Sequence, residues 1–171
     1  MSGEGFKKIN QNAENTAAVI YKSIGSKMPT EHDLIKWAEK IFNFQITLRY
    51  TKLPCSGLVL YNPLTKGYQI RINRSEPICR RRFTICHEVA HIVVKKSLAY
   101  GFSTGDIFTK GGLERFCDRF AASFLMPSDL FILKWKSISD ADLLKKARVA
   151  NFFNVSVDAA RYRAEELNLI N

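Results

Sequence analysis

The sequence has no long apolar run. No segment approaches the roughly 20 consecutive apolar residues that a membrane-spanning helix requires, so we expect no membrane partner. Its first residues, 1–5, are not a basic segment followed by an apolar stretch, and no secretory signal is predicted. The prediction that follows is a cytoplasmic protein.

Cysteine is scarce and unpaired in the sequence. The four cysteines are Cys55, Cys79, Cys86 and Cys117, and no two of them form a CxxC pair. This spacing argues against a zinc finger or a thioredoxin-like motif, and in the cytoplasm the thiols should be reduced. We expect Cys86 and Cys117 to be small core residues, with a zinc-ligand role for Cys117 as the alternative.

Acidic residues are outnumbered by basic ones. The 171 residues include 26 Lys and Arg against 16 Asp and Glu, for a net charge of +10. Such a balance favours acidic partners, nucleic acid among them. The charges are spread along the chain without a basic tail, however, so a solvated surface explains them equally. Direct nucleic-acid binding is possible and is not the favoured interpretation.

Histidine occurs only three times, and two of the three flank a glutamate in the segment His87-Glu88-Val89-Ala90-His91. On a helix, residues i and i+4 lie on one face, so both imidazoles can reach one zinc ion at about 2.0–2.1 Å. This is the HExxH pattern, in which Glu88 is the general base. The alternative is a buried helix with incidental histidines. His32 is predicted to lie on the surface.

A third zinc ligand must come from elsewhere in the fold. Glu114 and Asp118 lie one turn apart on a helix predicted over residues 113–126. We predict Glu114 as the ligand and Asp118 as the acceptor of a ligating histidine's free N–H. The reverse assignment and Asp106 stay open as alternatives. Tyr100 is a candidate donor to the oxyanion.

The hydrophobic periodicity predicts helices along most of the chain, with three strands between the second and the third of them. We expect two parts: a metallopeptidase-like domain over residues 1–136, with residues 1–11 disordered, and a C-terminal helical subdomain over residues 137–171 that packs on it. The predicted helices are 13–24, 31–42, 75–96, 113–126, 128–136, 139–153 and 156–167, and the predicted strands, joined as an antiparallel meander, are 44–50, 58–61 and 68–73. Residues 97–112 are predicted to form a loop.

The sequence leaves open the roles of two groups of basic residues. Arg80, Arg81 and Arg82 precede His87 and either contact an acidic substrate or form the solvent side of the helix; the second is favoured. Residues 139–167 resemble a helix-turn-helix that could enter a major groove, with Arg161 and Arg163 on its second helix. The favoured interpretation is that these helices pack on the core and leave both arginines exposed.

Two motifs resemble one protein family. The segment 82–91 (RFTICHEVAH) resembles the RFTxxHExxH segment of the ImmA/IrrE metallo-endopeptidases, and residues 114–127 are similar to that family's ExxANxFAAxLLMP segment. The chain departs from the pattern at Cys117, Asp118 and Phe124. The resemblance implies an α+β fold in which a small antiparallel or mixed sheet packs against the HExxH helix, with further helices at the C-terminus. It also implies zinc and cleavage of intracellular transcriptional repressors, of mobile-element or prophage type. The prediction is therefore a zinc endopeptidase that cleaves a helix-turn-helix repressor; the alternative is a DNA- or protein-binding regulator without proteolysis.

Overall fold

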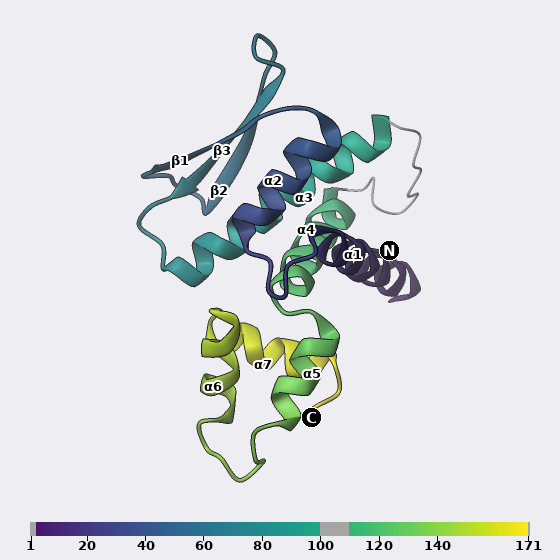
Figure 1. The fold of residues 1–171 in the computed structure, drawn as a ribbon, viewed down its shortest axis with the longest axis vertical. Helices are drawn as coiled ribbons and strands as arrows, with labels where there is room; N and C mark the ends of the chain where they lie inside the picture. The colour runs from purple at the N-terminus through teal and green to yellow at the C-terminus, as the bar shows by residue number, and fades with distance from the viewer. Residues whose placement is uncertain (1–2, 100–109, 171) are drawn as a thin grey trace.

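A computed structural model of the chain describes residues 3–99 and 110–170. These residues form an α+β fold of seven helices and a three-stranded sheet (Figure 1). The elements in chain order are α1 (Gly3–Ile24), α2 (Glu31–Phe42), β1 (Ile46–Thr51), β2 (Gly57–Asn62), β3 (Gly67–Asn73), α3 (Ile78–Ala99), α4 (Lys110–Leu125), α5 (Ser128–Lys136), α6 (Lys145–Phe153) and α7 (Val157–Glu166).

The sheet is mixed, with the strand order β1-β3-β2. The predicted hairpin of β2 and β3 is present, but β1 pairs in parallel with the other edge of β3. The predicted antiparallel meander is therefore wrong. Tyr68, Ile70 and Ile72 of the central strand, β3, are buried. Leu60 and Tyr61 of the edge strand β2 are exposed.

The sheet positions α3, which packs against β2 and β3 through one face. Ile85, Val89 and Ile92 of α3 are buried in the same core cluster as Ile70 and Ile72 of β3. Helix α2 lies beside α3 (Figure 1). The residues of α3 that do not enter this core are consequently available for the polar side chains of a site.

Helix α2 has the predicted bounds because its ends carry strong local signals. Thr30 and Asp33 form a capping box at its start, in which each side chain bonds the other residue's backbone N–H. Asn43 ends the helix in the left-handed conformation, at φ 52°. Leu34 and Ala38 are buried, as their i, i+4 spacing predicts.

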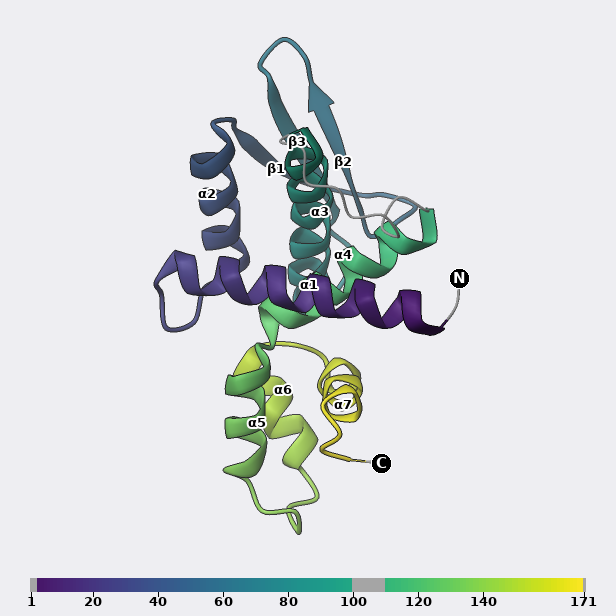
Figure 2. The same cartoon turned by 90° about the vertical axis from the view of Figure 1, so that its right-hand side faces the viewer.

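Helix α1 begins at Gly3, so the prediction that residues 1–11 are disordered is wrong for residues 3–11. Ile9, Ala13, Ala17 and Ile20 form a fully buried stripe at helical spacing. This stripe packs on α4, and Figure 2 shows α1 crossing beneath α3. Gln11, Asn12 and Asn15, which lie between these apolar positions, are on the exposed face of the docked helix.

Helices α5, α6 and α7 enclose a second hydrophobic cluster around Phe131, Trp135 and Phe153 (Figures 1 and 2). The cluster includes α5, which the predicted division at residue 136 assigns to the first part. The predicted helix 139–153 is too long, because residues 139–144 are not helical and Leu143 is 100% exposed. The predicted loop 97–112 is also too long, because α3 extends to Ala99 and α4 begins at Lys110.

Arg163 is the most deeply buried charge of the C-terminal helices, contrary to its predicted exposure. Its side chain is 1% exposed and lies 2.7 Å from a Glu14 oxygen of α1, and its Nε donates to the Met126 carbonyl. Arg119 of α4 pairs with Glu14 and with Glu166. Two cations and two carboxylates therefore join α1, α4 and α7.

Arg163→Met should lower the free energy of unfolding by about 3 kcal/mol, because it removes one of the two arginines paired with the part-buried Glu14 carboxylate and the donor to the Met126 carbonyl. Arg161→Met is the matched control. The Arg161 side chain lies at the surface beside Glu165, so the change should affect stability little. Urea unfolding of both variants measures the difference, and equal stabilities would contradict a structural role for Arg163.

Candidate metal centre

Helix α3 brings two imidazoles together. His87 and His91 are one turn apart on the face of α3 that lies between β2 and α4, and their Nε2 atoms are 3.0 Å apart. Glu88 lies between them in sequence and is only 7% exposed. The buried residues on the other face of α3 fix the orientation of these side chains, because the helix cannot rotate without exposing them.

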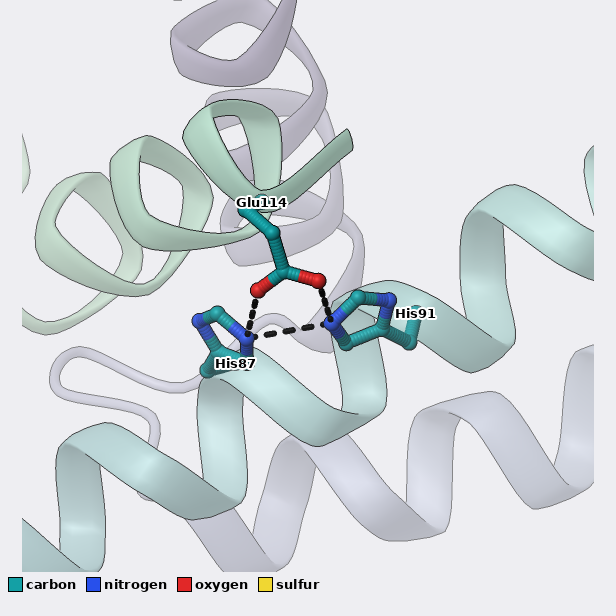
Figure 3. A group of neighbouring side chains, drawn as sticks. All are labelled: His87, His91 and Glu114. Atoms are coloured by element: carbon teal, nitrogen blue, oxygen red, sulfur yellow. Dashed lines mark hydrogen bonds and ion pairs between the residues drawn. The ribbon is translucent and has the colours of Figure 1, made fainter. Parts of the chain in front are cut away.

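Helix α4 supplies a carboxylate that faces both imidazoles. One Glu114 oxygen lies 3.4 Å from His87 Nε2, and the other lies 3.6 Å from His91 Nε2 (Figure 3). Within the described ranges, His87, His91 and Glu114 form a group whose ligand atoms all lie within 4.8 Å of one another. The structure thus brings together three of the predicted site residues.

The donor set fits zinc. Two imidazole nitrogens and one carboxylate oxygen are the ligands of many catalytic zinc sites. Donors bound to a tetrahedral zinc at about 2.1 Å lie about 3.4 Å apart. The three distances here, 3.0, 3.4 and 3.6 Å, bracket that separation. These three residues could therefore hold a zinc ion with little movement.

Asp118 lies behind His87, on the side away from Glu114. Its Oδ1 is 2.9 Å from His87 Nδ1, close enough to accept that nitrogen's hydrogen. A hydrogen bond at Nδ1 fixes the tautomer and leaves the Nε2 lone pair directed at the shared point. The geometry favours Glu114 over Asp118 as the candidate third ligand.

The pKa values of His87, Glu88 and His91 are shifted by their surroundings in different directions. Burial lowers the pKa of His87, but the hydrogen bond and charge of Asp118 outweigh burial and raise it. Burial and the neighbouring His87 lower the pKa of His91. Burial raises the pKa of Glu88. A zinc ion and a proton would therefore compete for His87 more strongly than for His91.

The site opens into a cleft of about 780 Å³. Its floor is α3, and its walls are β2 and the first half of α4. The lining includes Phe83, Thr84, Tyr61, Tyr68 and Leu113 in addition to the metal-site residues. In the described part of the chain β2 pairs with β3 alone, so the edge of β2 away from β3 is free.

Cys117 and His32 do not join the metal-site residues. Cys117 is fully buried in the core, where burial raises the pKa of its thiol, and it is not in the three-residue group. His32 is on the surface, as expected. Tyr100 and Asp106 lie outside the described residues.

The three consecutive arginines have three different environments. Arg82 bonds Glu31 of α2 and the carbonyls of Phe153 and Asn154, and so holds the end of α6. The Arg81 guanidinium lies 5.7 Å from the Tyr50 ring centroid. Arg80 lines the cleft.

Sequence reasoning missed the cleft walls and Lys95, which lines the cleft beyond His91. One signal was present, because Arg80, His87, His91 and Lys95 follow a helical spacing that places them on one face. The position of β2 beside that face had no comparable signal, since it depends on the strand order.

The family model described as Peptidase M78, the IrrE N-terminal-like domain, matches residues 43–165. A comparison with curated proteins found no significant match. No helix among residues 3–99 and 110–170 is both long and apolar enough to cross a membrane.

One similar solved structure is named as a Mycobacterium tuberculosis transcriptional regulator. It matches with a TM-score of 0.61 at 17% sequence identity, over 93% of this chain and 51% of that chain. The chain thus spans about half the length of that protein, and the likeness shows the fold. The family match covers most of the sequence and includes α3 and α4 with their candidate ligands: the chain belongs to the Peptidase M78 family, through its IrrE N-terminal-like domain.

Proposed function

We propose that the chain is a zinc-dependent endopeptidase that cleaves a helix-turn-helix transcriptional repressor and thereby derepresses the genes it controls. The observation that carries the proposal is the convergence of His87, His91 and Glu114 beside Glu88 at the floor of an open cleft. Family membership supports a metallopeptidase-type function. The substrate class rests on the resemblance of the two motifs to repressor-cleaving peptidases.

The residues divide the chemistry among them. His87, His91 and Glu114 would hold the zinc ion, and Asp118 would keep His87 in the tautomer that binds it. Bound zinc would supply Lewis-acid polarisation of the peptide carbonyl and acidify a water molecule. The Glu88 carboxylate accepts a proton from the attacking water and then delivers it to the leaving amine.

The free edge of β2 gives the substrate a place to bind. An extended peptide can add to an exposed strand edge through main-chain hydrogen bonds, whatever its side chains. Because β2 forms one wall of the cleft, such a peptide would pass over the floor of α3. This arrangement suits an endopeptidase, since the cleft does not require a chain end.

The substrate proposal is tested by co-expressing the chain with a helix-turn-helix repressor from the same genome. Wild type should cut the repressor at one or a few bonds, and the Glu88→Gln variant should leave it intact. Mass spectrometry of the fragments identifies the bonds. A repressor that stays whole with both proteins while its genes are switched on would overturn proteolysis. Because a repressor acts on DNA in the cytoplasm, the proposal places the chain there.

Helices α6 and α7, joined by a tight turn at Asn154, suggest DNA binding as a second candidate function. The side chains support it less well than they support the peptidase. Arg163 is buried, Arg161 is paired with Glu165, and Asp158 would bring negative charge toward phosphates at the start of α7. Steeply salt-dependent DNA binding by the purified chain would favour this candidate.

A further inference from the structure

Two cations lie at opposite ends of the cleft floor. Arg80 and Lys95 both belong to α3 and both line the cleft. The acidic and histidine residues of the cleft lining, His87, Glu88, His91, Glu114 and Asp118, gather around the candidate metal centre. Beyond that centre, the described lining of the cleft offers a peptide only positive charge.

Both cations are accessible to solvent, and each lies near an aromatic ring of the cleft lining. The Arg80 side chain is 53% exposed and lies over the Phe83 ring, at 5.4 Å from its centroid. Its ion pair with Glu76 is long, at 4.0 Å, and a hydroxyl of Ser56 accepts one of its hydrogens. Lys95 is exposed, and its Nζ is 5.7 Å from the centroid of the Tyr61 ring. Each cation therefore retains donors for a ligand.

The helix sets their distances from the reacting bond. Arg80 precedes His87 by about two turns, and Lys95 follows His91 by about one turn. From the centre of the motif these separations are about 13 Å and 9 Å along the helix axis, at 1.5 Å per residue. An extended peptide rises about 3.3 Å per residue, so the cations lie about four and about three residues from the scissile bond.

Strand β2 sets the direction of the peptide. It starts near Arg80, where Ser56 contacts the guanidinium and Gly57 abuts Thr84, and it reaches Lys95 at Tyr61. Antiparallel pairing is the more stable arrangement per residue. A peptide antiparallel to β2 would place its N-terminal side by Lys95 and its C-terminal side by Arg80.

We propose that Arg80 and Lys95 are specificity-determining residues that select substrates with acidic side chains on both sides of the scissile bond. Lys95 binds the side chain of an Asp or Glu about three residues before the scissile bond, and Arg80 binds that of an Asp or Glu about four residues after it. This inference rests on the proposed peptidase function, because it assigns positions relative to a bond that is cut.

The test uses one mixture of synthetic peptides, randomised at every position, in two assays with the zinc-loaded full chain. Glu88→Gln protein, which should bind without cutting, is used to capture peptides for sequencing by mass spectrometry. Wild type is used to cut them. Acidic residues should be enriched about two- to fivefold per position, as expected for exposed ion pairs, and less at high salt.

Variants assign each preference to one cation. Arg80→Gln should abolish the acidic preference after the bond only, Lys95→Gln the preference before it only, and Arg80→Glu should select Lys or Arg instead. Arg49→Gln and Lys40→Gln are matched controls, because both residues are exposed and neither lines the cleft. Both controls should keep the wild-type preferences.

The two assays separate the inference from the proposed function. Cleavage without an acidic preference, or with the two sides exchanged, overturns the inference and leaves the peptidase standing. Capture of acidic peptides that depends on Arg80 and Lys95, without any cleavage by wild type, supports charge selection by the cleft and overturns the peptidase. Neither capture nor cleavage overturns both.

Discussion

Glu88→Gln should lower peptidase activity by about two to four orders of magnitude while the protein keeps its fold and its zinc. The amide has nearly the same shape as the carboxylate but cannot accept a proton from water. Glu88 is buried beside the candidate ligands without belonging to their group, so its loss should spare metal binding. Repressor cleavage, bound zinc and thermal unfolding are the three measurements.

The matched control is Glu4→Gln, an identical change at an exposed position of α1. Its activity, zinc content and stability should equal those of wild type. Equal activity of Glu88→Gln and wild type would remove Glu88 from the mechanism. Loss of zinc together with activity would assign Glu88 to metal binding instead of proton transfer.

The sequence predicts the local parts of this structure well. The period of 3.6 residues and the capping residues fix α2, and the spacing of His87 and His91 places both on one face of α3. The one-turn spacing of Glu114 and Asp118 likewise anticipates their approach to His87 from α4. Short-range periodicity carries this information, because each motif lies within one helix.

Long-range contacts decide what the sequence does not predict. Nothing local distinguishes an edge strand from a central one, so the apolar run of β2 does not reveal that β1 pairs with β3. Helix α1 is polar on one side and is ordered by docking on α4. The burial of Arg163 depends on Glu14, which is far away in sequence.

The contacts of the three consecutive arginines, Arg80 to Arg82, likewise cannot be predicted from local sequence. The arginines have nearly the same local sequence environment, yet Arg82 closes contacts between α2, α3 and α6, and Arg80 lines the cleft. A helix turns about 100° per residue, so neighbours in sequence face different partners. Which of them meets a substrate therefore depends on the strand and the helix that flank α3.

Zinc binding is the second prediction with a large effect. The purified chain should hold about one zinc ion, and His87→Ala or His91→Ala should abolish the stoichiometric site, because each removes one of three protein donors. His32→Ala is the matched control, since His32 is exposed and lies outside the metal group. Metal analysis after dialysis without chelator measures the content, and wild type that retains no zinc when offered it would contradict the site.

The two carboxylates should differ in their effect on zinc affinity. Asp118→Asn should weaken zinc binding by about 10–100-fold, because the amide oxygen can still accept the hydrogen of His87 Nδ1 but has lost its charge. Glu114→Ala should weaken it more, because it removes an oxygen that faces both Nε2 atoms. Competition with a calibrated chelator measures both constants at one pH. The reverse order would assign the third ligand to Asp118 and require α4 to present its next turn to the metal.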